Sequence, residues 1–300
     1  MAAQTLSSIP AQVLQVYSRE AILEAQPLFV YRNFVEYKEQ LGIEPGKTIT
    51  FLKLANLTGG GLLNSEFDPI FKEAVQESTV SITVYEAGGA TQVTRAALEA
   101  SFRDTMSDYA VLLGRRYAEF LDGYLRDVFS GTANEQFAST ATSVGTIAGG
   151  MVFTTAEVKD AIETLKTLNA PMFNRGGDQH YICIAHPHQM RSLRDDADWK
   201  HAHEYTNPEN IYNGEVGRYE NCIFIETTQQ TIDINAGLGG TVDVYHALFM
   251  GARSVGFAET VPMEIVTDGV ESFGRLISLG WYTIMGGGII NDYLVECFTA

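Results

Sequence analysis

Cysteine is scarce in this 300-residue sequence, and its spacing carries no signature. Cys183, Cys222 and Cys297 lie far apart, are odd in number and form no C-x-x-C pair. Disulfide frameworks and zinc sites both depend on closely spaced or evenly numbered cysteines. The pattern therefore signals neither, and we interpret the three residues as buried free thiols.

Positive charge is also in short supply. The chain has 20 Lys and Arg against 37 Asp and Glu, which gives a formal net charge of -17. A protein that grips nucleic acid needs clustered cations to displace the counterions of the phosphates. The composition therefore argues against a nucleic-acid-binding protein, since DNA would be repelled on average.

Long apolar runs and targeting signals are missing as well. No segment approaches the ~20 apolar residues of a membrane span. The first 20 residues, MAAQTLSSIPAQVLQVYSRE, lack the basic and apolar regions of a signal peptide. We expect synthesis in the cytoplasm and no membrane partner. The hydrophobic content of 45% nevertheless excludes disorder and supplies a real core.

Proline is absent from residues 97–129, and this stretch is the main clue to the architecture. Its apolar residues recur in steps of three and four, which predicts one unbroken amphipathic helix of roughly 50 Å at about 1.5 Å per residue. We expect a spine in an elongated fold, with part of its apolar face covered by other copies of the chain. The periodic residues are Leu98, Phe102, Met106, Tyr109, Leu113, Tyr117, Phe120, Tyr124 and Val128.

Two segments before this helix change to the period of a β-strand. Residues 47–56 and 78–86 alternate apolar and polar side chains, and some 20 residues that begin with Gly59, Gly60 and Gly61 separate them. We expect a long hairpin that has too little apolar surface to be stable alone and lies on a neighbour. Residues 1–35 are interpreted as an arm with a short helix near residues 11–25.

A second domain is expected after the Ser/Thr/Gly/Ala-rich segment 139–150. Thr154 or Thr155 can cap a helix that runs to about residue 169. Further elements are a helix over about 187–194 and strands over 181–185, 222–227, 243–250, 264–267, 275–285 and 289–298.

Two glycine-bearing segments look like phosphate-binding loops but fit poorly. Residues 42–48, GIEPGKT, are one residue short of the G-x-x-x-x-G-K-[ST] spacing and lead into a strand, whereas phosphate binding needs a helix N-terminus. Residues 237–240, GLGG, precede a strand and lack the G-x-G-x-x-G spacing. We predict no cofactor and no catalytic residue.

Four of the six histidines fall within 18 residues. They are His186, His188, His201 and His203, and Asp195, Asp196 and Asp198 lie among them. A metal-dependent enzyme is one interpretation. No H-E-x-x-H or facial-triad spacing is present, so surface or structural histidines are favoured and no metal is predicted.

The chain from residue 184 onward resembles a known family. IAHPHQMRSLRDDADWKHAHEY and NPENIYNGEVGRYENCIFIETT resemble the signature of the major capsid proteins of tailed double-stranded DNA bacteriophages typified by coliphage N-four. The order His186-Pro187, Trp199, residues 211–218 and Glu226-Thr227 carries the resemblance. It extends to GKTITFLKLANLTGGG, VYHALFMGARSVG and GWYTIMGGGIINDYLVECF. Gly286-Gly287-Gly288 departs from it, because alanine-like residues are expected there.

The resemblance implies the Hong Kong 97-like α+β fold. On this map, residues 1–35 form the N-terminal arm and 36–95 the extended hairpin loop. Residues 96–135 and 246–300 form a peripheral domain built on the spine helix, and 136–245 form the axial domain.

The resemblance also implies the function and the partners. The chain would self-assemble into hexamers and pentamers of an icosahedral head shell that encloses double-stranded DNA without specific binding. Portal, scaffolding and decoration proteins would be further partners, and the location would be the virion capsid. The alternative is a nanocompartment shell. Candidate intersubunit contacts are Lys53, Glu66, Asp68, Lys72, Arg103, Arg115 and Arg116.

Overall fold

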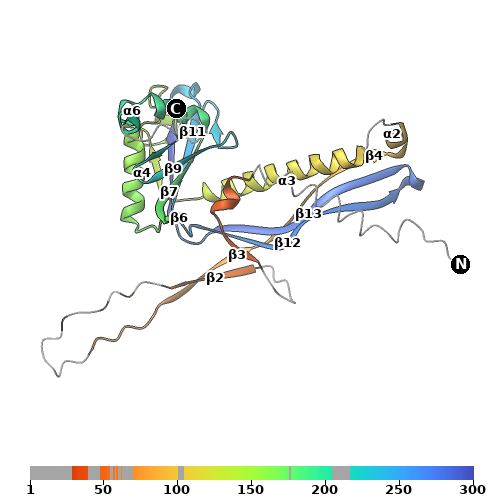
Figure 1. The fold of residues 1–300 in the computed structure, drawn as a ribbon, viewed down its shortest axis with the longest axis horizontal. Helices are drawn as coiled ribbons and strands as arrows, with labels where there is room; N and C mark the ends of the chain where they lie inside the picture. Colours follow the sequence, from red (N-terminus) through yellow and green to blue (C-terminus); the bar gives the residue numbers. More distant parts are fainter. Residues whose placement is uncertain are drawn as a thin grey trace.

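The computed structural model describes residues 29–39, 48–54, 57, 59, 62, 70–100, 105–175, 177–204 and 217–300. Within these ranges the molecule is an elongated α+β fold with three parts (Figure 1). A helical spine lies along a long sheet, a second sheet with its own helices stands at one end, and a hairpin projects away from both. The predicted arm helix near residues 11–25 lies outside the described residues.

The helices and strands follow one another with short connections. The helical elements are η3 (Tyr31–Phe34), α2 (Arg95–Ala100), α3 (Thr105–Phe129), η4 (Val144–Thr146), α4 (Thr155–Thr167), α5 (Pro187–Asp195), α6 (Ala197–Glu204), η6 (Leu238–Gly240) and η7 (Ser272–Gly274). The strands are β1 (Glu36–Glu39), β2 (Thr48–Leu54), β3 (Glu77–Thr83), β4 (Tyr85–Thr94), β5 (Glu135–Phe137), β6 (Phe173–Arg175), β7 (Asp178–Ala185), β8 (Arg218–Tyr219), β9 (Cys222–Glu226), β10 (Ile232–Asp233), β11 (Val244–Met250), β12 (Val255–Glu271), β13 (Leu276–Ile289) and β14 (Leu294–Thr299).

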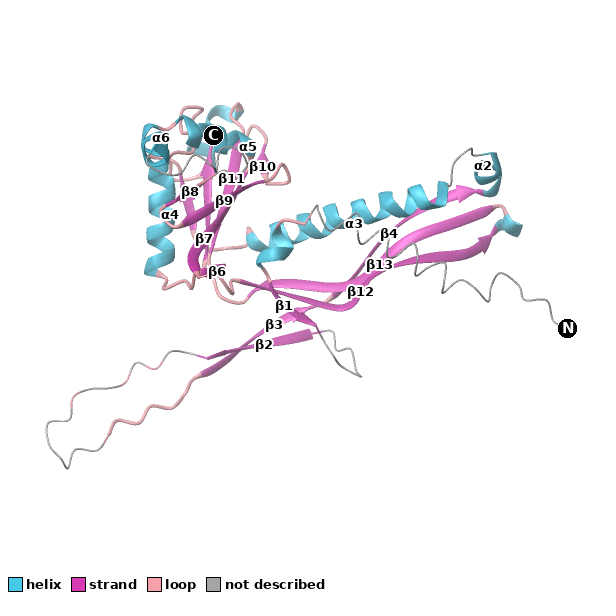
Figure 2. Ribbon diagram, in the orientation of Figure 1, coloured by secondary structure: helices cyan, strands magenta, loops and turns pink. Residues whose placement is uncertain are grey.

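The spine sheet has four strands in the order β1-β12-β13-β4. β12 and β13 are long antiparallel strands, β4 is antiparallel to β13, and β1 is parallel to β12. Helix α3 lies along one face, where Met263, Ile265, Leu279 and Trp281 belong to the same buried cluster as its apolar side chains. Figure 2 shows the helix following the length of the two long strands.

The prediction of one unbroken helix over 97–129 is wrong at its beginning. Arg95–Ala100 form the separate helix α2, which stands at an angle to α3 in Figure 2, and α3 begins at Thr105. No residue of α2 is buried, so the apolar period continues through a turn that has no core to pack against. The 25 residues of α3 span roughly 37 Å at about 1.5 Å per residue.

Helix α3 is not wholly buried within the subunit. Leu113, Tyr117, Leu121 and Leu125 form its buried stripe, whereas Leu112 is 56% exposed. The exposed side also carries charged residues. Part of the helix surface therefore remains free for contacts with other chains.

The second sheet has its main strands in the order β5-β14-β11-β7-β9-β8, and we call residues 136–245 with β11 and β14 the axial unit. Its two faces are both buried, because alternate residues enter different cores. Cys183, Phe249 and Val295 face helices α4, α5 and α6, while Ile184 and Leu248 face the spine side. The three cysteines are buried and free, as predicted.

Most predicted elements of the axial unit are confirmed. The side chain of Thr154 caps α4 by accepting a hydrogen bond from the Ala156 amide, and Pro187 begins α5. The strands expected over 264–267 and 275–285 are parts of the longer β12 and β13. Strand β4, within the range expected for the hairpin loop, instead pairs with β13 in the spine sheet.

Candidate assembly surfaces

The hairpin is anchored at its base. β2 and β3 pair antiparallel from Thr48↔Thr83 to Leu54↔Glu77, as their alternation predicts. Ile49, Phe51 and Ile82 point into a small core that includes Ala258 of β12 and Ile290 after β13. The first residues of β2 and the last residues of β3 are therefore fixed to the spine sheet.

The glycine run that departs from the resemblance has a structural cause at this base. A Cβ at Gly286 would lie 2.4 Å from the Thr83 carbonyl oxygen, and one at Gly288 would lie 3.1 Å from Ile82. Gly287 points to the other face, where its amide donates a 2.9 Å hydrogen bond to the Tyr124 hydroxyl of α3. The hairpin base can cross the sheet this closely only because β13 has no side chains there.

Beyond its base the hairpin exposes apolar side chains. Figure 1 shows β2 and β3 leading away from the body of the molecule. Such an exposed apolar series is typical of a surface that another chain covers. The exposed residues are Leu52 (62%), Leu54 (59%), Leu57 (59%), Leu62 (95%), Ile70 (71%), Phe71 (65%) and Val75 (55%).

The predicted contact charges lie in two separate regions. Lys53 and Lys72 are exposed on the hairpin, and Arg115 and Arg116 are exposed on α3. Arg116 lies 3.4 Å from Glu119 within its own helix. The structure therefore does not bring the hairpin charges and the spine charges of one subunit together, and their role between subunits stays a prediction. Glu66, Asp68 and Arg103 lie outside the described residues.

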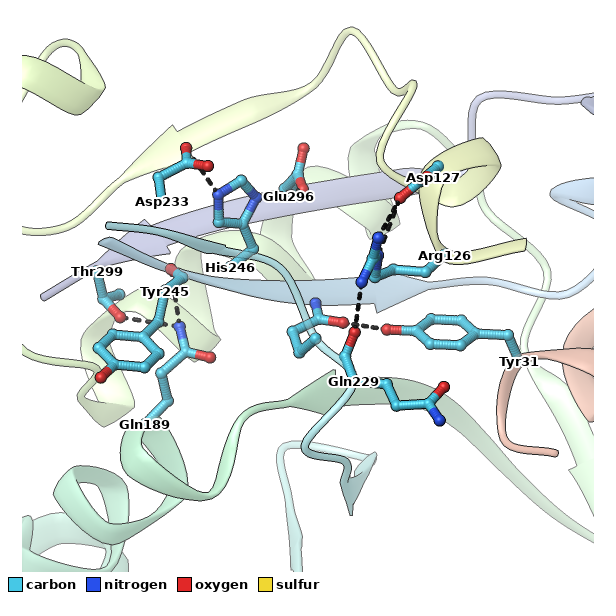
Figure 3. Close-up of polar contacts among 11 residues, drawn as sticks. Tyr31, Arg126, Asp127, Gln189, Gln229, Asp233, Tyr245, His246, Glu296 and Thr299 are labelled. Carbon is cyan, nitrogen blue, oxygen red and sulfur yellow. Dashed lines mark hydrogen bonds and ion pairs between the residues drawn. The ribbon is translucent and has the colours of Figure 1, made fainter. Parts of the chain in front are cut away.

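The arm is attached to the spine by a buried carboxylate. Asp122 of α3, 0% exposed, accepts hydrogen bonds from the amides of Val30 and Tyr31 through one oxygen, both at 2.9 Å. The Tyr31 ring packs 5.7 Å from that of Phe129, and its hydroxyl donates to Gln230 of the axial unit (Figure 3). Burial raises the pKa of the Tyr31 phenol, so it stays a hydrogen-bond donor.

A second buried carboxylate joins the arm to the spine sheet. Glu259 of β12, 4% exposed, accepts hydrogen bonds from Tyr37 at 2.9 Å and Tyr117 at 3.3 Å, and pairs with Arg32 at 3.4 Å. Burial and the Glu259 charge raise the pKa of the Tyr117 phenol. These contacts satisfy a buried charge, whose desolvation would otherwise be costly.

A third polar centre lies in the axial unit. His246 of β11 lies between two carboxylates, Glu296 of β14 and Asp233 of β10 (Figure 3). Close by, Arg126 of α3 donates to the Gln229 carbonyl at 2.7 Å. The segment between β9 and β11 is therefore held by both the spine helix and the axial sheet.

The clustered histidines have structural roles where the structure describes them. His186 caps α5 by accepting a hydrogen bond from the His188 amide at 3.2 Å, and the His188 ring stacks on Tyr245 at 4.6 Å. The side chains of His201 and His203 lie outside the described residues. Within the described ranges, no group of three or more His, Cys, Asp or Glu is placed to hold a metal ion.

The other motifs weighed in the sequence give no ligand site. Residues 42–47 lie outside the described residues, and Thr48 opens strand β2, as expected for a strand entry. Residues 238–240 form a short 3-10 turn before β11. None of the helices in the part of the chain that the structure describes has the length and apolarity that a bilayer crossing needs.

Sequence reasoning missed the buried polar residues that join the parts of the molecule. Asp122 and Glu259 read as ordinary charged positions in a helix and a strand, and His246 reads as one residue of a buried strand. One signal pointed at Asp122, because it lies one position beyond Leu121 on the buried side of an amphipathic helix.

Comparison with known proteins agrees with this architecture. The family model described as phage capsid protein matches residues 32–288. No curated protein sequence matches the chain.

Solved capsid structures share the fold over most of their length. The capsid of Ralstonia phage GP4 has a TM-score of 0.76 at 17% identity and covers 89% of this chain and 87% of its own. The cyanophage Pam1 capsid has a TM-score of 0.70 at 15% identity, with 90% and 91% covered. The capsid of Helicobacter pylori bacteriophage KHP30 has a TM-score of 0.65 at 15% identity, with 88% and 87% covered.

The family match covers more than half of the chain, and the structural matches have the same spine and axial architecture. Both comparisons describe a structural protein of the virion capsid and not an enzyme, and they do not favour the nanocompartment alternative. The chain therefore belongs to the phage capsid protein family, as a tailed-phage major capsid protein that self-assembles into the icosahedral head shell.

Proposed function

We propose that the hairpin and the arm make the contacts that link copies of this chain into the shell. The observation that supports the proposal is the hairpin's divided character. Its base is buried against the spine sheet, while Leu52, Leu54 and Phe71 further out are more than half exposed. Apolar area left on an extended two-stranded ribbon gains about 25 cal/mol per Å² when a neighbour covers it.

The unpaired edges of the hairpin add a second source of affinity. β2 and β3 form a two-stranded sheet, so each strand has one free edge among the described strands. A strand of a neighbouring copy can add to such an edge through main-chain hydrogen bonds. The charges of Lys53, Lys72, Arg115 and Arg116 would then set the register between copies, together with Glu66, Asp68 and Arg103.

We retain the four-part division with residues 1–35 as arm, 36–95 as hairpin loop, 96–135 with 246–300 as peripheral domain and 136–245 as axial domain. Within 36–95, the part that projects as the hairpin is 48–83, because β1 and β4 pair with the spine sheet. Hexamers and pentamers would place the axial domains around their symmetry axes.

The further partners follow from the proposed role. The shell would enclose double-stranded DNA without a specific site, since a subunit of charge -17 offers little attraction to phosphates. Portal, scaffolding and decoration proteins would join it, and synthesis and assembly would take place in the host cytoplasm.

The hairpin proposal is tested with a surface variant. Leu52→Ser with Phe71→Ser should abolish shells seen by negative-stain electron microscopy while the subunit keeps its wild-type far-ultraviolet circular dichroism. Thr79→Ser, opposite Leu52 in the hairpin register, removes little apolar area and serves as the matched control. Normal shells from the double variant would contradict the proposal, and particles filled with protein cargo would point to a nanocompartment.

The net charge predicts how assembly depends on salt. Copies that each carry -17 repel one another, and the screening length falls from ~30 Å at 0.01 M to ~10 Å at 0.1 M salt. We expect light scattering to show faster assembly at 0.1 M than at 0.01 M. Assembly rates that do not change with salt would remove electrostatic repulsion from the account.

A further inference from the structure

Both ring nitrogens of His246 face carboxylate oxygens. Nδ1 lies 2.8 Å from Glu296 and Nε2 lies 3.1 Å from Asp233. The ring itself is 7% exposed, and Phe298 packs against it at 4.7 Å. Three strands, β10, β11 and β14, thus meet at one imidazole, as Figure 3 shows.

We propose that His246 is a pH-sensitive clasp, which holds strand β10 on the axial sheet when the imidazole is protonated and releases it when the imidazole is neutral. The inference does not rest on the proposed roles of the hairpin and the arm. It concerns the segment between β9 and β11, residues 227–243.

The clasp follows from counting donors. Ionised carboxylates only accept hydrogen bonds, so both contacts need an N–H on the ring, and only the imidazolium carries two. A neutral imidazole has one N–H, and its other nitrogen presents a lone pair to a carboxylate oxygen. Loss of the proton therefore replaces one charge-assisted hydrogen bond with a repulsive contact.

The two carboxylates differ in how easily they can leave. Glu296 is 3% exposed and belongs to β14, which pairs with β11 along its whole length. Asp233 has a 41% exposed side chain on a strand of two residues. The neutral ring therefore keeps its Nδ1–H bond to Glu296, and Asp233 turns to water.

The remaining contacts of the segment limit what is released. Leu238 donates to the Ile147 carbonyl at 2.8 Å, and the amide of Asn235 donates to Asp243 at 2.8 Å. At the other end, Gln229 and Gln230 are held by Arg126 and Tyr31. The part that depends on the clasp is thus residues 231–234, where Ile234 is 73% exposed.

The charged groups around the ring give the direction of the pH effect. Burial lowers the pKa of His246, but the hydrogen bonds and charges of Glu296 and then Asp233 outweigh it and raise the pKa above 6.5. The stabilisation is therefore complete below about 6.5 and is lost as the pH rises through the higher folded pKa.

Other titratable groups near the centre do not reverse this direction. The phenol of Tyr31 and the thiol of Cys297 lie close enough to Glu296 to feel its charge, and burial raises both pKa values, so both stay neutral. The guanidinium of Arg126 is directed to Gln229 and Asp127.

Hydrogen exchange measured by mass spectrometry on the full-length chain between pH 6 and 9 tests the clasp. After correction for the intrinsic pH dependence, a peptide over 231–236 should open more as the pH rises, by up to about tenfold per pH unit above the folded pKa. A peptide over 247–250 should not change. Wild-type opening at 231–236 that is independent of pH would overturn the proposal.

Two variants separate the clasp from general loosening. Asp233→Asn places an amide N–H opposite the neutral ring nitrogen, so β10 should stay closed at every pH in the range. His246→Gln should leave exchange at 231–236 fast and flat with pH. An Asp233→Asn variant with the same pH slope as wild type would overturn the proposal, even if His246→Gln does not fold.

Discussion

The axial unit and the hairpin use apolar residues in opposite ways. Every residue of β14 is buried, whereas β2 is buried only at Ile49 and Phe51 and is exposed from Leu52 onward. Burial in the first region is complete within one chain, and in the second it is left for another chain to complete. Stability of the subunit and association between subunits are therefore encoded in different segments.

The largest test of this contrast compares two phenylalanines. Phe249 is 0% exposed and packs 6.1 Å from Phe153, so Phe249→Ala should lower the free energy of unfolding by about 3–5 kcal/mol. Phe71 on the hairpin is 65% exposed, and Phe71→Ala should change it by less than about 0.5 kcal/mol. Urea titration followed by circular dichroism measures both, and equal losses would break the comparison.

A smaller effect is expected where the hairpin meets the body. A Cβ at Gly286 would lie 2.4 Å from a backbone oxygen, so Gly286→Ala should cost about 1–3 kcal/mol through overpacking. Gly123 of α3 is the matched control, because a Cβ there meets nothing within 4 Å among the described residues. Gly123→Ala should gain about 0.5–1 kcal/mol in the helix.

Thermal unfolding of the two glycine variants distinguishes a close crossing from ordinary chain flexibility. Opposite shifts of the unfolding midpoint support an anchored base. A Gly286→Ala midpoint at or above that of wild type would mean that the hairpin is loosely attached even at its base.

The smallest effect concerns the arm, which lies between the two extremes. Burial raises the pKa of Asp122, against the opposing influence of the Tyr31 and Val30 amides and Arg126. Because the folded pKa is raised, ionisation costs stability as the pH rises upward from about 4. Asp122→Asn keeps the accepting oxygen without the charge, and should gain no more than about 1 kcal/mol at pH 7.

The pH dependence and a second variant check this interpretation. The advantage of Asp122→Asn in urea titrations should shrink as the pH falls toward 4. Asp122→Ala removes the acceptor and should lose about 1–3 kcal/mol. A destabilised Asp122→Asn at pH 7 would show that the charge itself holds the arm.

Local pattern was enough for elements whose cause is local. The alternation of Val80, Ile82 and Val84 predicts β3 and its pairing, and Thr154 and Pro187 mark helix starts by their own capping chemistry. The four-part capsid architecture came from the resemblance, because no periodicity specifies how distant segments pack.

Elements that depend on distant partners were missed or shortened. β4 contains Gly88 and Gly89, which disfavour a strand until the indole of Trp281 covers one of them. β12 runs through Pro262 with irregular pairing nearby, so the sequence shows only a fragment of it. Charges such as Lys53 and Arg115 cannot be assigned partners from one chain, since the partners belong to other copies.

The close crossing at the glycine run has a mechanical consequence. A beam clamped at one end turns a force at its tip into a bending moment at the clamp. Here the clamp is a single strand segment, with the hairpin on one side at Gly286 and Gly288 and the Tyr124 hydroxyl on the other at Gly287. A pull on the hairpin of one subunit would thus be transmitted as torque to its own spine helix, so strain in the lattice acts on the longest rigid element of the subunit.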